Sequence, residues 1–262
     1  LLWGADKGAT TLVLIHHGLG EHAGRYDSVA AMLAETAVVV ASYDMAGHGT
    51  SPRASGDAGT LGDLARTLHQ MIPLIMEATK TTSVVLMGHS LGGAVVGHYL
   101  TTMTPHAAIS KAVLSAPPVS VHRTFTIQAK IVAAHLMARL NPSGTLANEI
   151  SASQISSVEA EADRYASDPL IHDRISFALG LSIIQDAEQI PNNAGTIKMP
   201  VLMFQGSEDI IVERSGTEEL YENLGSTEKS LHFIEGSRHE CHHETAACVA
   251  EVTALLVGFI KN

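Results

Sequence analysis

The stretch Ser83–Gly93, which reads SVVLMGHSLGG, decides the fold. An apolar run leads into Gly88-His89-Ser90-Leu91-Gly92, and a second apolar segment follows. This G-x-S-x-G spacing is typical of a sharp turn from a buried strand into a helix, because glycines two residues before and after the serine relieve crowding. At such a turn the serine hydroxyl projects above the sheet, close to backbone N–H groups that stabilise a developing negative charge. We therefore predict that Ser90 is a nucleophile.

Outside this stretch, short apolar runs alternate with longer amphipathic segments, which is the pattern of a mostly parallel sheet flanked by helices. The predicted strands are Thr11–His17, Ala37–Tyr43, Ser83–Gly88, Lys111–Ser115, Pro200–Gly206 and Ser230–Glu235. The predicted helices are Tyr26–Glu35, Leu61–Thr79, Leu91–Met103, Glu213–Leu224 and Glu244–Ile260. The strand runs are too continuously apolar for a sheet with one wet face, so both faces are expected to be covered. The fold class is α/β, in a single domain that spans residues 1–262.

The regular alternation breaks between two predicted strands, and residues 118–198 are expected to form a helical lid inserted into the domain. Helix-like stretches occur at Ile127–Leu140 and Ile175–Ile184. The apolar side chains of the insertion either pack onto the body or line a binding surface. The candidates for a binding surface are Ile131, Leu136, Met137 and Leu181.

The charge balance excludes some partners. The 262-residue chain has 16 Lys and Arg against 27 Asp and Glu, a formal net charge of −11, and no basic cluster. Binding to a nucleic-acid backbone is therefore not expected, nor is strong attraction to anionic lipid. Residues 81–110 carry no Asp, Glu, Lys or Arg, but Gly88, Gly92 and Gly97 interrupt them, so no transmembrane helix is predicted. A cytoplasmic or peripheral-membrane location is favoured.

A nucleophilic serine needs a base, and the base needs an acid that orients it. Asp209 follows the predicted strand VLMFQG, and His239 follows the predicted strand LHFIEG. Both therefore lie at carboxyl ends of strands, where open α/β sheets place their functional sites. We predict Asp209 as the acid and His239 as the base, with Glu208 as the nearest rival acid.

Several motifs in the same order resemble the monoglyceride lipases, in the lysophospholipase-like branch of the α/β-hydrolase superfamily. They span residues 17–244 and are His17-Gly18-Leu19-Gly20-Glu21-His22 with Gly24-Arg25-Tyr26, Asp44-x-x-Gly47-His48-Gly49-x-Ser51, Gly88-His89-Ser90-Leu91-Gly92-Gly93, Ser167-Asp168-Pro169-Leu170-Ile171, Gln205-Gly206-Ser207-x-Asp209, Glu235-Gly236-x-x-His239 and Glu244. The resemblance implies an α/β-hydrolase fold with Ser90, Asp209 and His239 as catalytic triad. It also implies that the backbone N–H groups of Leu19 and Leu91 form the oxyanion hole.

The same resemblance implies a serine ester hydrolase that cleaves monoacylglycerol, a small lipid ester, to fatty acid and glycerol without cofactor or metal. The lid would then hold the acyl chain or make peripheral membrane contact. A short-chain carboxylesterase or a lysophospholipase with the same triad is the main alternative. A serine aminopeptidase and a non-catalytic interaction protein are weaker ones.

A metalloprotease-like signature competes with this interpretation. His239-Glu240-Cys241-His242-His243 fits H-E-x-x-H, which binds zinc when both histidines share one face of a helix. Here the first histidine directly follows a Gly-Ser-Arg turn, and no histidine follows His243, which leaves Glu244 or Glu251 as the candidate third ligand. The signature is therefore expected not to form a catalytic metal site, although adventitious metal binding by this cluster is expected.

Overall fold

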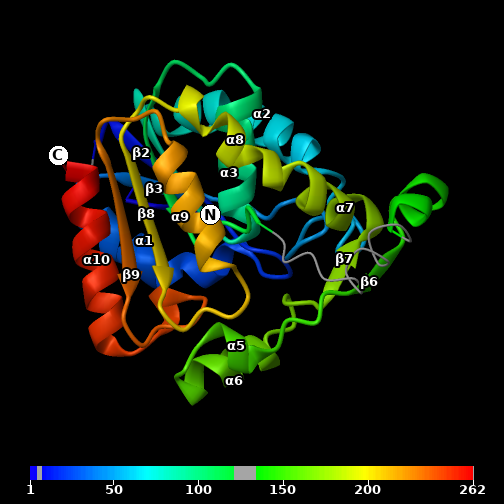
Figure 1. The fold of residues 1–262 in the computed structure, drawn as a ribbon. Coiled ribbons are helices and arrows are strands. Elements are labelled where there is room, and N and C mark those ends of the chain that lie inside the picture. Colours follow the sequence, from blue (N-terminus) through cyan, green and yellow to red (C-terminus); the bar gives the residue numbers. More distant parts are fainter. Residues whose placement is uncertain (5–7, 121–133, 262) are drawn as a thin grey trace.

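The computed structural model describes residues 1–4, 8–120 and 134–261. Within these residues, seven strands form one sheet in the order β1-β3-β2-β4-β5-β8-β9 (Figure 1). All neighbours run parallel except β1, which pairs antiparallel with β3 at one edge. The strands of this sheet are β1 Leu2–Trp3, β2 Thr11–His16, β3 Val39–Ser42, β4 Ser83–His89, β5 Ile109–Ser115, β8 Val201–Gly206 and β9 Lys229–Ile234.

Helices cover both faces of the sheet. Alternate residues of each strand point to opposite faces, so each strand contributes apolar side chains to both layers of helices. Leu12 and Leu14 of β2 pack with α2 Leu61–Thr79 and α3 Leu91–Thr102, together with α9 Arg214–Asn223. Val13 and Ile15 pack instead with α1 Asp27–Ala34 and α10 Ala246–Lys261. The sheet is therefore the middle layer of three, as its continuously apolar strands predicted. Among the described residues, no helix is both long enough and apolar enough to cross a bilayer.

The predicted α/β-hydrolase fold is confirmed, and the six predicted strands of the main sheet lie within two residues of their expected bounds. The edge strand β1 was not predicted, because two residues are too short to show a pattern. The last helix begins at Ala246 and not at Glu244, which has an extended backbone (φ −112°, ψ −164°). The Glu244 carboxylate accepts hydrogen bonds from the backbone N–H and hydroxyl of Ser157, and these contacts hold it outside the helix.

Residues between β5 and β8 form an insertion that is less purely helical than predicted. Its helical segments are residues 134–140, α5 Ala152–Ile155, α6 Glu159–Ser167, α7 Phe177–Gln185 and α8 Ile190–Asn193. Two three-residue strands, β6 Thr145–Ala147 and β7 Arg174–Ser176, pair antiparallel within it and were not predicted. The predicted helix from Ile175 was therefore wrong at its start, because the Ser176 hydroxyl accepts a hydrogen bond from the Leu179 N–H and caps α7.

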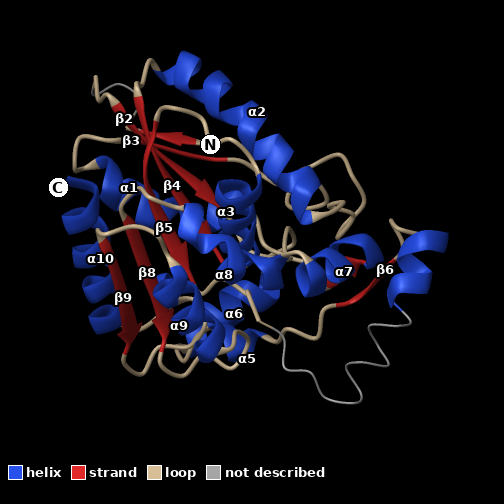
Figure 2. Cartoon of the chain, turned by 45° about the horizontal axis from the view of Figure 1, so that its top comes forward, coloured by secondary structure: helices blue, strands red, loops and turns tan. Residues whose placement is uncertain are grey.

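The insertion lies against one end of the sheet. Both views place α5 and α6 beside the carboxyl ends of β8 and β9, and β6, β7 and α7 further along the same side (Figures 1 and 2). Four short 3-10 turns complete the described structure: η1 Ala23–Tyr26, η2 Ala187–Gln189, η3 Ala194–Thr196 and η4 Cys241–His243. The predicted helix Ile127–Leu140 is described only from residue 134, and Ile131 lies outside the described residues.

Candidate active site

Ser90 lies at the turn between β4 and α3, as predicted, with φ 50° and ψ −121°. A non-glycine residue rarely adopts this region, and such strain persists only where the surroundings enforce it. A Cβ at Gly92 would lie 2.2 Å from the carbonyl oxygen of His16, and one at Gly88 would lie 2.3 Å from that of Gly92. The two glycines are therefore required by close backbone packing on both sides of the serine.

Asp209 and His239 are joined directly, although 30 residues separate them in the chain. The Asp209 Oδ2 atom lies 2.8 Å from His239 Nδ1, and both side chains are almost completely buried. The other carboxylate oxygen accepts hydrogen bonds from the backbone N–H groups of Ile211 and Val212, at 2.8 and 3.1 Å. The carboxylate is therefore held in one orientation and leaves Nε2 of the imidazole free for another partner.

This pair raises the proton affinity of the imidazole. Burial alone would lower the pKa of His239, but the attraction and hydrogen bond of Asp209 outweigh it, so the pKa is raised above its ordinary value. The pKa of Asp209 is lowered, because the same contact with His239 outweighs the opposing effect of burial. An ionised acid beside a basic imidazole is the electrostatic arrangement that general-base catalysis requires.

Ser90 and His239 line one narrow cavity of about 10 Å³. Gly18 and Leu19 from the loop after β2 also line it, and Ile150, Ile155 and Tyr165 of the insertion close it from above. A space of this size holds about one water molecule. The insertion therefore covers the serine in the described conformation.

The two backbone donors that the resemblance implied lie on different elements. Leu19 lines the cavity in the loop after β2. Leu91 is the first residue of α3, where a backbone N–H has no carbonyl partner within the helix. Both N–H groups therefore belong to segments next to Ser90, one on each side of the turn.

A buried ion network connects the loop that carries Leu19 with the segment after His239. Glu21 accepts hydrogen bonds from the backbone N–H of Gly18 and the hydroxyl of Tyr26. Arg25 bridges two carboxylates, since its Nε lies 3.1 Å from Glu21 Oε2 and its Nη2 contacts Glu240. The motif residue Glu21 thus braces the cavity wall through Arg25, an arrangement that sequence spacing did not reveal.

The insertion is also tied to the loop that carries His239. The backbone N–H of Glu240 donates to the carbonyl of Ile155 at 2.9 Å, and the Ser156 hydroxyl donates to the carbonyl of His243. The guanidinium of Arg238 donates to the carbonyls of Ser153 and Ser156. The covering segment and the imidazole therefore share one hydrogen-bonded framework.

Of the lid residues predicted to bind substrate, the three that the structure describes do not line the cavity of Ser90. Leu136 is 58% exposed, Met137 is half-buried, and Ile131 lies outside the described residues. Leu181 lines a separate cavity of about 590 Å³ with Thr60, Ala178 and Gln185, which contains neither Ser90 nor His239. The apolar side chains over the serine are instead Ile150 and Ile155, which stand in a polar stretch (NEISASQISS) that shows no apolar periodicity.

The H-E-x-x-H signature does not form a metalloprotease site. His239 precedes the 3-10 turn η4, so His239 and His243 do not share a face of one α-helix. Its Nδ1 is taken by Asp209. A different group, Glu240 with His242 and His243, has potential ligand atoms within 4.8 Å of one another.

Known proteins resemble the chain over almost its whole length. A family model described as Serine aminopeptidase, S33 matches residues 7–246. The monoglyceride lipase of Rattus norvegicus is 30% identical over 246 residues, which are 92% of this chain and 79% of that protein. An uncharacterised abhydrolase domain-containing protein of Dictyostelium discoideum is 31% identical over 260 residues, but the chain spans only 27% of its length.

Solved structures share the fold. The monoacylglycerol lipase of Paleococcus ferrophilus superposes with a TM-score of 0.87 at 29% identity, covering 99% of this chain and 96% of that one. A monoglyceride lipase of Saccharomyces cerevisiae in complex with a substrate analogue gives the same TM-score of 0.87 at 21% identity, covering 99% and 90%. At that lower identity the likeness concerns the fold alone.

Proposed function

Since the chain belongs to the α/β-hydrolase family that the Serine aminopeptidase, S33 model describes, with monoglyceride lipases among its relatives, we propose that it is a serine hydrolase that cleaves monoacylglycerol to fatty acid and glycerol. The observation that carries this proposal is the Asp209–His239 pair, with its 2.8 Å contact, opening onto the cavity that Ser90 also lines. A serine and an imidazole in one cavity, with a carboxylate bonded to the far nitrogen of the imidazole, are the requirement for acyl transfer through a serine.

In the proposed reaction the Ser90 Oγ attacks the ester carbonyl carbon while His239 Nε2 takes its proton. Asp209 stabilises the imidazolium that forms. The tetrahedral oxyanion accepts hydrogen bonds from the N–H groups of Leu19 and Leu91. When the intermediate collapses, His239 donates its proton to the leaving glycerol oxygen, and the acyl group stays on Ser90. Water, deprotonated by His239, then attacks this ester and releases the fatty acid.

We propose that residues 118–198 act as a lid within a single domain. The cavity of about 10 Å³ over Ser90 leaves no room for an acyl chain, so Ile150, Ile155 and Tyr165 must move before a lipid enters. Exposed apolar side chains on the same insertion support peripheral membrane contact. These are Leu136, Leu140 and Leu146, exposed by 58%, 72% and 45%.

The narrowness of the cavity also favours a second candidate, a short-chain carboxylesterase with the same triad. An acetyl ester needs far less movement of the insertion than a long acyl chain needs. A hydrolysis panel of monoacylglycerols, lysophospholipids, aminoacyl amides and p-nitrophenyl esters of graded length separates these candidates. Preference for long-chain monoacylglycerols supports the first proposal, and preference for acetyl esters supports the second.

The nucleophile is tested by replacing Ser90 with alanine. Ser90→Ala is expected to remove nearly all activity and labelling by a fluorophosphonate while the circular dichroism spectrum stays unchanged. The matched control is Ser207→Ala, a serine in the turn after β8 whose hydroxyl accepts a hydrogen bond from the backbone N–H of Gly236. Full labelling of Ser90→Ala would overturn the assignment.

A further inference from the structure

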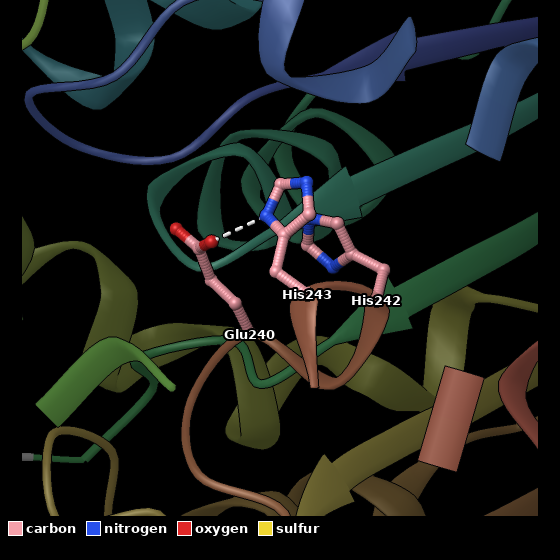
Figure 3. Close-up of side chains that lie close together, drawn as sticks. All are labelled: Glu240, His242 and His243. Carbon is pink, nitrogen blue, oxygen red and sulfur yellow. Dashed lines mark hydrogen bonds and ion pairs between the residues drawn. The ribbon is translucent and has the colours of Figure 1, made fainter. Parts of the chain in front are cut away.

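The segment that follows His239 carries a group of side chains that the proposed reaction does not use. Glu240, His242 and His243 offer one carboxylate oxygen and two imidazole nitrogens within 4.8 Å of one another. The carboxylate of Glu240 and the ring of His243 point toward each other, and the ring of His242 lies beside that of His243 (Figure 3). We propose that these three residues bind Zn²⁺, and that occupancy of this site slows the reaction of Ser90.

His242 is the observation that points to a ligand. It is only 3% exposed, and within the described part of the chain neither of its ring nitrogens has a hydrogen-bond partner. Leaving a buried polar atom unpartnered is unfavourable, and a bond to a metal ion removes that cost.

The donor set suits zinc. Two imidazole nitrogens and one carboxylate oxygen are ligands that Zn²⁺ takes in four-coordinate sites, where water supplies the fourth position. Bonds of about 2.0–2.2 Å place ligand atoms roughly 3.4 Å apart. Atoms that lie within 4.8 Å of one another can reach this spacing through small side-chain movements. The Glu240 carboxylate contacts the guanidinium of Arg25 and the ring of His243, so it already faces a positive charge and a second ligand.

An entry path for the ion reaches two of the ligands. His242 and His243 line an open cavity of about 430 Å³. Its wall carries more carboxylates than guanidinium groups: Asp27, Glu161, Asp168 and Glu244 against Arg25 and Arg164. A predominance of negative charge attracts a dication, and a cavity of this size also admits the water that completes the coordination.

The ion competes with Arg25, whose Nη2 contacts both Glu240 and His243 Nδ1. When zinc takes the Glu240 carboxylate, Arg25 keeps its second partner, Glu21 at 3.1 Å, and its position 5.0 Å above the ring of Tyr165. The exchange therefore places a double positive charge where a single one stood. After this exchange, Glu21 still holds the loop that carries Leu19.

The site is close enough to the proposed base to affect it, and the inhibitory part of this inference rests on the proposed function. Glu240 lines the cavity with His239, and the ring of His89 lies 4.7 Å from that of His239 and 5.1 Å from that of His242. The charged groups around His239 are Asp209, Glu240, Glu21 and Arg25. A dication bound by Glu240 therefore lies close to the imidazole, and it repels the positive charge that forms on His239 during attack.

Two measurements on metal-free protein test the proposal. Calorimetric titration with Zn²⁺ is expected to show one ion bound per chain, with affinity lowered at least about tenfold in His242→Gln and His243→Gln. His232→Gln, a histidine on β9 outside the cluster, is the control and should bind as the unsubstituted chain does. Saturating Zn²⁺ is expected to slow fluorophosphonate labelling at least about tenfold, reversibly with a chelator, and much less in His243→Gln.

His243 is the partly exposed member of the pair, so His243→Gln keeps the test informative if His242→Gln fails to fold. Absence of calorimetric binding, or equal loss in His232→Gln, would overturn the site. Binding that depends on His243 without any effect on labelling would overturn the inhibitory role. Failure of the unsubstituted, metal-free chain to label at all would count against the proposed function, while the titration would still decide the metal site.

Discussion

At the scale of single residues, Asp209 and Glu208 are adjacent carboxylates with opposite surroundings. The Asp209 side chain is fully buried and pairs with His239, whereas Glu208 is exposed. An orienting acid must be fixed and shielded from water, because a solvated carboxylate has many competing partners. This difference was invisible in the local sequence, where both residues follow the same strand.

Replacing each of these acids in turn tests the assignment. Asp209→Asn keeps the size of the side chain but removes its charge, and kcat is expected to fall on the order of 10⁴-fold with KM little changed. Glu208→Gln is the matched control and should retain the kcat of the unsubstituted enzyme. Steady-state kinetics with a p-nitrophenyl ester gives both values. If Glu208→Gln were inactive and Asp209→Asn active, the orienting acid would be Glu208 and not Asp209.

The raised pKa of His239 makes a prediction about pH. The imidazole accepts the Ser90 proton only when it is neutral, and Asp209 favours its protonated form. Activity is therefore lost as the pH falls through the raised pKa, so the acidic limb of the kcat/KM profile should lie above the ordinary histidine value of 6.5. Measurement of kcat/KM across the pH range checks this. An acidic limb centred below pH 6.5 would contradict the coupling of His239 to Asp209.

At the scale of elements, the turn between β4 and α3 depends on close contact with β2. The carbonyl oxygen of His16 at the end of β2 occupies the space that a side chain at Gly92 would need, at 2.2 Å. Neither backbone segment can move freely, since both belong to packed elements of the core. Glycine is therefore needed at position 92 because α3 packs closely against β2, and not because of the turn alone.

Gly92→Ala is expected to destabilise the protein by about 1–3 kcal/mol, because overpacking forces a backbone shift, and to misplace Ser90 as well. Gly258→Ala in α10 is the matched control. A Cβ there meets nothing within 4 Å, so alanine should leave stability unchanged or raise it by up to about 1 kcal/mol. Urea unfolding of both variants measures the difference. A Gly92→Ala protein as stable as the parent would show that β2 can shift to make room for the added methyl group.

At the scale of the whole molecule, the insertion joins an exposed apolar surface to the cover over Ser90. Leu136 and Leu140 are exposed on one part of it, while Ile155 and Tyr165 are buried over the cavity on another. Hydrogen bonds from Arg238 to Ser153 and Ser156 tie the covering part to the body. If the insertion acts as the proposed lid, its movement connects surface contact with access to the serine.

A charge on the exposed part should affect long substrates selectively. Leu136→Asp is expected to lower kcat/KM for a long-chain monoacylglycerol about tenfold or more and to leave hydrolysis of p-nitrophenyl acetate unchanged, because each buried methylene contributes about 0.8 kcal/mol. Leu74→Asp is the matched control, since Leu74 on α2 is equally exposed at 58% but lies outside the insertion. Equal losses on both substrates, or the same loss in Leu74→Asp, would contradict a role of Leu136 in lipid handling.

The sheet, the helices that cover it and the position of the serine turn could all be predicted from local sequence patterns. Runs such as VVLM in β4 and VLMF in β8 are apolar enough to specify burial on both faces, and the spacing of Gly88 and Gly92 around Ser90 specifies the turn. These signals are local, because the period of side-chain burial and the space available to a glycine depend on a few neighbouring residues. Asp209 and His239 were predicted for a related reason, since both directly follow such runs.

Only the tertiary structure decided what surrounds the serine. Ile155 and Tyr165 stand in polar stretches and reach the cavity through the path of the insertion, while Leu136 and Leu181 show apolar periodicity but lie elsewhere. The bridge from Glu21 through Arg25 to Glu240 joins residues more than 200 positions apart. Such contacts depend on where whole segments meet, and the free energy of that meeting is spread over many weak interactions that leave no pattern within any one segment.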